Sequence, residues 1–220
     1  MKRTALFLLL YFVTFIIFIS CNPSIVFDQP QPQGVRNEKN FPKKLIGHYF
    51  CTQNHSTLFI THDKIIKKSL VELNVLKSEL DSMREYKLFK DTLIDILTQK
   101  RFKVEYRNDT IVFFDQITDT LFMLSDENIL RKWKGYYFLN EQSKNGWIVR
   151  KLEYKRGGKL ILASIVSPDE LENLKEVMDI EKIKADDGET IGYRVRPSKL
   201  QLKRFIRNKG FSDFEEYQRE

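Results

Sequence analysis

The chain has 220 residues, 37 of them Lys or Arg and 30 Asp or Glu, so its formal net charge is +7. This length suits one sizeable domain or two small ones. The cations are scattered, without a stripe of Arg and Lys interleaved with aromatic residues, so nucleic acid is not an expected partner. Only two cysteines occur, which excludes a disulfide-rich framework.

The first residues have the pattern of a secretory signal. Lys2 and Arg3 precede fifteen largely apolar residues, positions 5–19. As a helix rising about 1.5 Å per residue, this run reaches only about 22 Å, less than the roughly 30 Å of a bilayer core. We therefore expect a cleaved signal rather than a transmembrane helix.

The apolar run ends in Phe18-Ile19-Ser20-Cys21: an apolar residue, a variable position, a small residue and a cysteine. This motif resembles the lipobox of bacterial lipoproteins, and the resemblance covers residues 1–21 only. It implies a signal peptide at 1–20 and lipidation of Cys21, whose thiolate takes a diacylglyceryl group before the freed amine takes a further acyl chain such as palmitate. Two or more chains hold a protein stably on a membrane.

The lipoprotein resemblance implies a place in the cell envelope, by analogy at the outer membrane facing the periplasm. If Cys21 is acylated, Cys51 has no partner within the chain. If the signal is instead a plain secretory one, Cys21 and Cys51 are free to form a disulfide. The two interpretations are mutually exclusive.

Residues 21–44 are predicted to form a lipid-anchored tether. Pro23, Pro30, Pro32 and Pro42, together with a Gln-Pro alternation, favour extended and poorly packed backbone. The exception is Ser-Ile-Val-Phe at 24–27, which has the composition of a short docked strand.

Residues 45–166 are predicted to form an antiparallel β domain. Runs rich in β-branched and aromatic residues alternate with turn signals, among them Asn108-Asp109 and Gly157-Gly158. The fold class expected is β-rich α+β, an antiparallel meander that forms a small, lipocalin-like barrel or a sandwich, with helices at the C-terminus.

Residues 167–220 are predicted to form an α-helical cap packed on the β domain. Ser167 and Glu170 make a capping-box pattern, as do Ser212 and Glu215, and a further helix is expected from Ser198 to about Asn208. A short strand at 190–195 interrupts the helices.

All three histidines lie within fifteen residues, with a cysteine among them: His48, Cys51, His55 and His62. These are candidate zinc or copper ligands, and Cys51 with a histidine is a candidate nucleophile pair. The spacing matches no known zinc pattern, and an odd separation places His48 and Cys51 on opposite faces of a strand. No phosphate loop, dinucleotide fingerprint or nucleophile elbow is present. We therefore assign no catalytic residue, metal or other cofactor.

The function expected from the sequence is that of an envelope lipoprotein that binds or scaffolds without catalysis. Its partners would be the membrane, through the lipid anchor, and an envelope protein. The alternative is a lipocalin-like carrier of a small apolar ligand, and a third hypothesis is an envelope hydrolase. A closed cavity favours the carrier, whereas a filled interior with an exposed apolar patch favours a protein partner.

Overall fold

The structure is a computed structural model that describes residues 24–80, 82–165 and 168–220, so the lipobox residues lie outside the described part. The described chain is β-rich and its strands are mainly antiparallel, which confirms the expected class. It forms two compact units. The described residues of unit 1 are 24–38, 126–153 and 162–214, with the masked positions left out. Those of unit 2 are 39–80, 82–125, 154–161 and 215–220.

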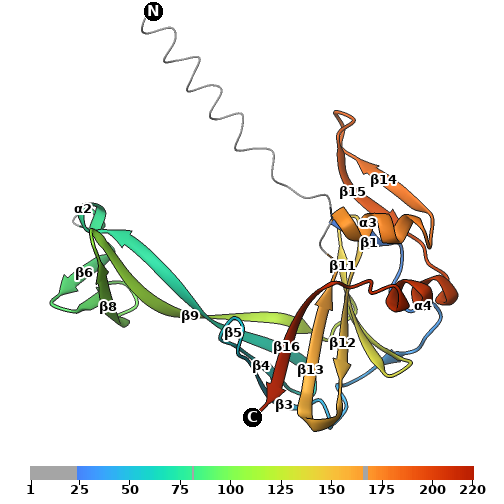
Figure 1. Ribbon diagram of the computed structural model, residues 1–220, viewed down its shortest axis with the longest axis horizontal. Coiled ribbons are helices and arrows are strands. Elements are labelled where there is room, and N and C mark those ends of the chain that lie inside the picture. The colour runs from blue at the N-terminus through green and yellow to red at the C-terminus, as the bar shows by residue number, and fades with distance from the viewer. Residues whose placement is uncertain (1–23, 81, 166–167) are drawn as a thin grey trace, which may run out of the picture. The chain divides into compact units, whose positions relative to one another are not determined.

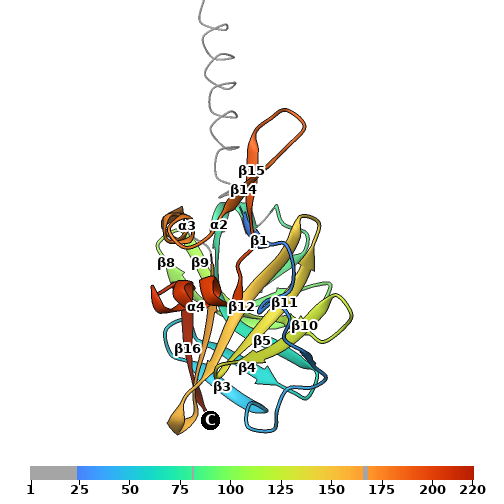
Figure 2. The same ribbon diagram turned by 90° about the vertical axis from the view of Figure 1, so that its right-hand side faces the viewer.

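Unit 1 contains an open sheet with the strand order β14-β15-β1-β12-β11-β10-β2 (Figure 2). The bounds of these strands are β1 (Ser24–Phe27), β2 (Asn37–Glu38), β10 (Asn128–Trp133), β11 (Tyr136–Ser143), β12 (Gly146–Tyr154), β14 (Ile180–Lys184) and β15 (Thr190–Val195). Strand β1 pairs in parallel with β15 along its whole length and antiparallel with β12 through Phe27 and Trp147. It is therefore an interior strand of the sheet.

Two helices, α3 (Pro168–Lys175) and α4 (Lys199–Arg207), complete unit 1. Helix α4 confirms the expected second helix: Ser198 caps it, and the capping box is closed by Gln201. Leu202 and Phe205 of α4 are fully buried in a core cluster with Phe27 of β1. The apolar side chains of the cluster are Phe27, Phe138, Val149, Ala163, Leu174, Met178, Val195, Leu202, Phe205 and Phe211.

The docked strand expected at 24–27 is confirmed as β1. The tether expected over the rest of 21–44 is wrong for residues 28–44, where Gln31 and Phe41 are buried in the fold. Phe27 is completely buried, and the proline-bearing loop after it is held by two side chains. Arg131 donates from Nη1 to the carbonyls of Pro30 and Pro32. Asn140 accepts a hydrogen bond from the backbone nitrogen of Gln31 at 2.5 Å and donates one to the Gln31 carbonyl at 2.9 Å. After β1 this segment forms bends and turns rather than extended backbone, with only the two-residue strand β2. Its buried backbone groups are satisfied by partners from distant residues.

Unit 2 contains a second open strand order, β16-β3-β4-β5-β9-β8-β7-β6. The bounds are β3 (Gly47–Cys51), β4 (Ser56–Ile60), β5 (Lys64–Leu76), β6 (Tyr86–Phe89), β7 (Thr92–Asp95), β8 (Arg101–Arg107), β9 (Thr110–Met123) and β16 (Asp213–Arg219). The remaining elements are α2 (Lys77–Leu80), the 3-10 turn η1 (Arg156–Gly158) and β13 (Lys159–Ser164). Strands β12, β13 and β16 contribute residues to both units.

The short strand expected at 190–195 is confirmed as β15, but the rest of the expected helical cap over 167–220 is corrected by two further strands, β14 and β16. Ser212 and Glu215 do not begin a helix, because β16 pairs with β3 through Gln218–Phe50 and Arg219–Tyr49. The hairpin expected across Asn108 is confirmed: β8 and β9 pair up to Arg107–Thr110, and Asn108 has a φ of 57°.

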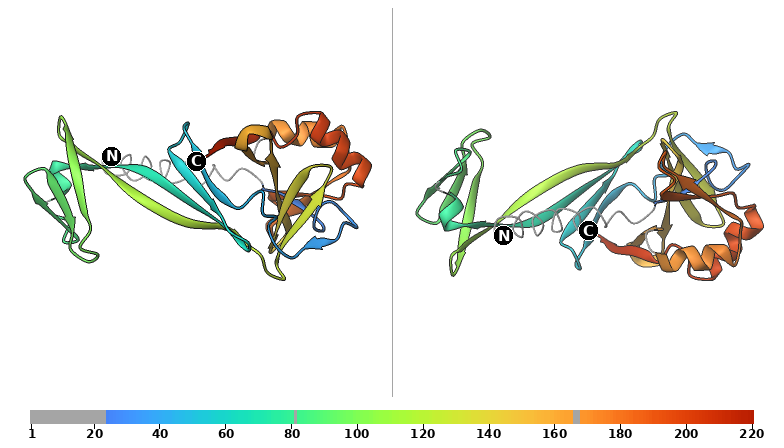
Figure 3. Two further views of the ribbon diagram at one scale, coloured as in Figure 1. Left: turned by 90° about the horizontal axis from the view of Figure 1, so that it is seen from below. Right: turned by 90° about the horizontal axis from the view of Figure 1, so that it is seen from above.

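Strands β5 and β9 form a long two-stranded arm within unit 2 (Figures 1 and 3). Strand β4 pairs with β5 only over residues 65–69, and β8 pairs with β9 only over residues 110–113. The far end of the arm carries β6, β7, β8 and α2 around a small core of Leu80, Leu93, Phe102, Val104, Ile111 and Phe113. No helix among the described residues is long and apolar enough to cross a membrane.

Asn140→Ala tests the packing of the N-terminal segment. The substitution leaves the buried backbone N–H and C=O of Gln31 without partners, and each such loss costs about 1–3 kcal/mol. We expect a lower melting temperature and faster proteolysis between residues 28 and 38. The exposed Asn40→Ala should change neither property, and equal behaviour of the two variants would contradict the packing role of Asn140.

Candidate functional site

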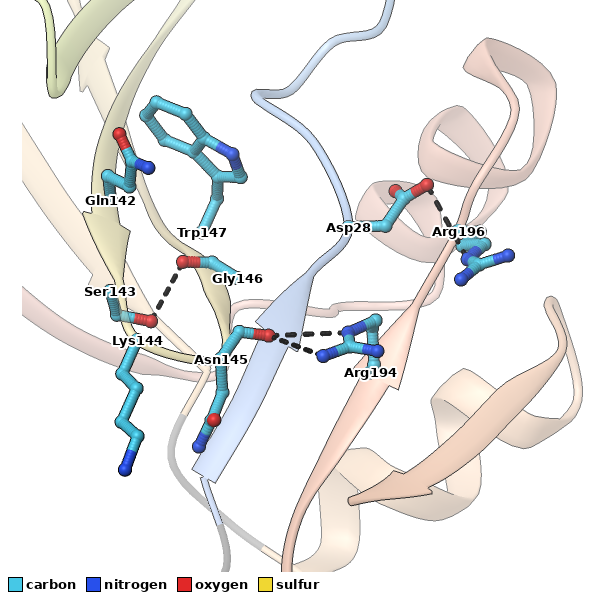
Figure 4. Close-up of a pocket in the computed structure, with 9 residues that line it drawn as sticks. All are labelled: Asp28, Gln142, Ser143, Lys144, Asn145, Gly146, Trp147, Arg194 and Arg196. Atoms are coloured by element: carbon cyan, nitrogen blue, oxygen red, sulfur yellow. Dashed lines mark hydrogen bonds and ion pairs between the residues drawn. The ribbon is translucent and has the colours of Figure 1, made fainter.

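A polar recess of about 400 Å³ opens in unit 1 beside β1 (Figure 4). Three segments surround it: the β11–β12 turn, the residue after β1, and the C-terminal end of β15 with the residue that follows. Its lining residues are Asp28, Gln142, Ser143, Lys144, Asn145, Gly146, Trp147, Arg194 and Arg196.

The turn at the recess requires a glycine. Gly146 has a φ of 145°, and a Cβ atom at this position would stand 2.6 Å from the carbonyl oxygen of Phe27. The turn is closed by Ser143, whose hydroxyl donates to the Gly146 carbonyl at 2.8 Å. Close approach of β12 to β1 therefore fixes where the turn residues point.

Two arginines form the opposite wall. Arg194 donates from Nε and Nη2 to the carbonyl of Asn145, at 3.2 and 3.0 Å, and its Nη1 lies 3.6 Å from Glu181. Arg196 lies 3.6 Å from Asp28 and 3.6 Å from the same Glu181. The second carboxylate oxygen of Asp28, Oδ1, is buried and accepts no hydrogen bond from the described residues.

The side chains that line the recess are mostly polar or charged. Of its three cations, Arg194 and Arg196 are paired with Glu181 and Asp28, whereas Lys144 forms no ion pair with either of these carboxylates. The recess therefore offers charged and hydrogen-bonding groups to a small polar ligand. The half-buried ring of Trp147 adds a flat apolar surface. Ser143 uses its hydroxyl on the turn, and no histidine or cysteine lines the recess, so no nucleophile–base pair forms there.

The four candidate metal ligands do not converge. Cys51 is a free, fully buried thiol, whereas His48 on the same strand is exposed and packs its ring 4.6 Å from that of Phe59. This agrees with the opposite faces expected from their spacing. His55 lies in the β3–β4 turn, and His62 lies 3.5 Å from Asp63. Among the described residues, no group of three or more His, Cys, Asp or Glu side chains is arranged to hold a metal ion.

A second recess, of about 410 Å³, lies at the far end of the arm in unit 2. Most of its lining is apolar or aromatic, with two lysines: Lys77, Leu80, Met83, Tyr86, Lys87, Leu88, Tyr106 and Ile111. Lys77 is held at its rim, with its ammonium 2.6 Å from the Asn108 carbonyl and 5.3 Å from the Tyr106 ring centre. This volume falls within the range of small-molecule sites.

The C-terminal strand carries a polar network that the sequence did not indicate. Glu215 accepts hydrogen bonds from Lys67 at 2.6 Å, Asn54 at 2.5 Å and Tyr217 at 2.7 Å. Tyr217 is buried, which raises its pKa, and its hydroxyl lies 3.3 Å from the buried Ser56. Lys67 and Asn54 lie 148 and 161 positions from Glu215 in sequence, so only the fold brings these two donors to it.

A second glutamate, Glu170 of α3, is buried in unit 1 with 1% of its surface exposed. Its Oε1 accepts a hydrogen bond from the backbone nitrogen of Ser212, while Oε2 is buried without a partner in the described part of the chain. Burial raises the pKa of Glu170, and the hydrogen bond from Ser212 offsets only part of this.

In comparisons with protein-family models, curated proteins and solved structures, nothing matches this chain.

Glu215→Gln tests the C-terminal network. Burial alone would raise the pKa of Glu215, but its three donors, Lys67 above all, lower it on balance below the ordinary 4.5. Stability from this group is therefore present above pH 4.5 and lost as the pH falls through the lowered pKa. The variant should lose about 1–3 kcal/mol near neutral pH and show a weaker decline in acid. Thermal unfolding from about pH 7 to 3 measures both; an unchanged acid slope would contradict the assignment.

Glu170→Gln should have the opposite effect. The folded state binds the Glu170 proton more tightly than the unfolded chain, so its contribution to stability is present below pH 4.5 and lost as the pH rises through the raised pKa. Glutamine keeps an oxygen for Ser212 and removes the charge. We expect a higher melting temperature than wild type near pH 8 and a smaller difference near pH 4. A variant that is less stable at pH 8 would show that the carboxylate itself is required.

Proposed function

We propose that this protein is a lipid-anchored cell-envelope protein whose β-rich body binds or scaffolds a partner without catalysing a reaction. Cys21 carries the lipid, in the outer membrane, and the folded units face the periplasm. The signal pattern of residues 1–21 supports the anchor. The absence of a nucleophile–base pair among the residues that line the polar recess supports a binding role.

The observation that carries this proposal is the position of β1. Its first residue, Ser24, follows Cys21 by three positions, a chain length of at most about 10 Å. Strand β1 is paired on both edges, with β15 and β12. A lipid on Cys21 therefore holds unit 1 close to the membrane through an interior strand, without a long tether.

This attachment implies which end of β1 carries the polar recess relative to the lipid anchor. Asp28 follows the last residue of β1, four residues along an extended strand from Ser24, or about 13 Å. The recess therefore lies at the end of β1 away from the anchor, where it meets solutes and proteins of the aqueous compartment. Its charged and hydrogen-bonding lining suits a partner that presents a small polar group.

The carrier hypothesis keeps one favourable observation, the recess at the end of the arm, whose mixed lining includes Leu80, Met83 and Leu88. A lipocalin-like carrier needs a closed barrel around its ligand, and the strand orders of the two units are open. This recess is instead a local feature of unit 2. A carrier would purify with an apolar ligand in this recess, and a scaffold would not.

Cys21→Ser tests the anchor. The wild-type protein should enter a detergent phase and incorporate labelled fatty acid. The variant lacks the thiol that accepts the diacylglyceryl group, so we expect an unprocessed species of larger mass without label. Cys51→Ala is the matched control, because that thiol is buried in unit 2 and should not affect labelling. Labelled Cys21→Ser protein of normal size would refute the proposal.

A further inference from the structure

The arm of unit 2 has an unusual edge. Over residues 70–76, β5 pairs with β9 on one side, and no strand of the described chain pairs with it on the other. This segment reads Leu-Val-Glu-Leu-Asn-Val-Leu, without a proline or lysine. Natural proteins usually protect a long edge with such residues, because unpaired N–H and C=O groups attract another strand.

The sequence of this edge is a palindrome in hydropathy. Around Leu73 as centre, Val71 mirrors Val75 and Leu70 mirrors Leu76, while the two polar residues, Glu72 and Asn74, mirror each other. An antiparallel strand pair related by a two-fold axis joins positions in this way. From this symmetry we propose that residues 70–76 pair with the same residues of a second copy of the chain, with Leu73 opposite Leu73.

The side chains fit this register. Leu70 and Leu76 are 48% and 44% exposed, and the register places each against the other on one face of the joined sheet. Glu72 meets Asn74 rather than a second glutamate, and its charge is already balanced by Arg107 at 3.2 Å. On the opposite face, Leu73 and Val75, which flank the core at the end of the arm, extend that core into the second copy.

Self-pairing would also stabilise the arm. A two-stranded ribbon is marginally stable in water, and three or more strands with an apolar face are needed for independent stability. Along residues 70–72, where neither β4 nor β8 adds a third strand, the arm consists of β5 and β9 alone, and edge-to-edge pairing of two copies makes four strands there. Along residues 73–76, β8 also pairs with β9, so the joined sheet is wider. The free edge of β9 is less suited, because residues 114–123 carry Asp115 and Asp119 and have no such symmetry.

Cysteine cross-linking in membranes tests the register with the full chain. Leu70→Cys and Leu76→Cys, each with its own tag, are expressed together and oxidised. The register places position 70 directly opposite position 76, about 4.5–5.5 Å between Cα atoms, within disulfide range. Position 70 lies about 20 Å from its own copy. We expect a mixed dimer only when both variants are present, independently of whether Cys21 carries lipid.

Maleimide labelling of both exposed thiols serves as the control for access. Labelled but uncross-linked mixtures would overturn the proposal, and so would self-cross-linking of Leu70→Cys alone, which requires another register. Pairing with an extended peptide of a different protein predicts no dimer at all.

Charge variants give a second, independent readout. The double variant Leu70→Lys/Leu76→Lys opposes two cations at each contact, so its sedimentation mass should fall to that of one chain. Leu70→Lys/Leu76→Glu alters the same two exposed positions but pairs opposite charges, and should regain twice that mass. Equal masses for two folded variants would refute the pairing.

Discussion

The double pairing of β1 is the constraint on which the rest of unit 1 depends. A glycine faces each end of this strand: a Cβ atom on Gly192 would stand 2.9 Å from the Ser24 carbonyl oxygen, and one on Gly146 would stand 2.6 Å from that of Phe27. Between them, Phe27 fills the core that α4 closes with Leu202 and Phe205. The same close approach sets the β11–β12 turn, and hence the recess beside Asp28. The positions of the core and of the candidate site therefore both depend on the pairing of β1.

Unit 2 is stabilised at the two ends of its arm by different interactions. At one end, Glu215 of β16 accepts hydrogen bonds from Lys67 of β5 and from Tyr217 of its own strand. These hydrogen bonds are strong because the acceptor is a carboxylate. At the other end, the core around Phe113 supports β6, β7 and β8. Between these ends the arm has only its own two strands, with Leu70, Phe114 and Ile117 at least 40% exposed. An arm supported at both ends and bare in the middle is the form expected of a surface that another chain completes.

Local signals in the sequence were sufficient for some elements. The helix after Ser198 and the hairpin at Asn108 rest on caps and turn residues, whose effects act within a few positions, and both were predictable. The docked strand at 24–27 was predictable from its composition, whereas the tether predicted for residues 28–44 failed because Asn140 holds Gln31 from 109 positions away. The recess beside Arg194 was not predictable for the same reason: each wall comes from a different part of the chain. The histidines and Cys51 show the reverse case: they are close in sequence, but the fold places them on opposite faces of a strand and in turns.

The two glutamates of the capping-box patterns show why a local motif does not predict the electrostatic environment of its residues. Glu170 and Glu215 each follow a serine by three positions. In the fold, Glu170 is buried with one backbone donor and its pKa is raised, whereas Glu215 receives three side-chain donors and its pKa is lowered. One motif thus has two opposite electrostatic outcomes, set by donors that the motif does not contain. Since Glu170 belongs to unit 1 and Glu215 to unit 2, rising pH weakens the first unit through its glutamate and falling pH weakens the second. Two groups that look identical in sequence therefore contribute opposite pH dependences to the stability of the fold.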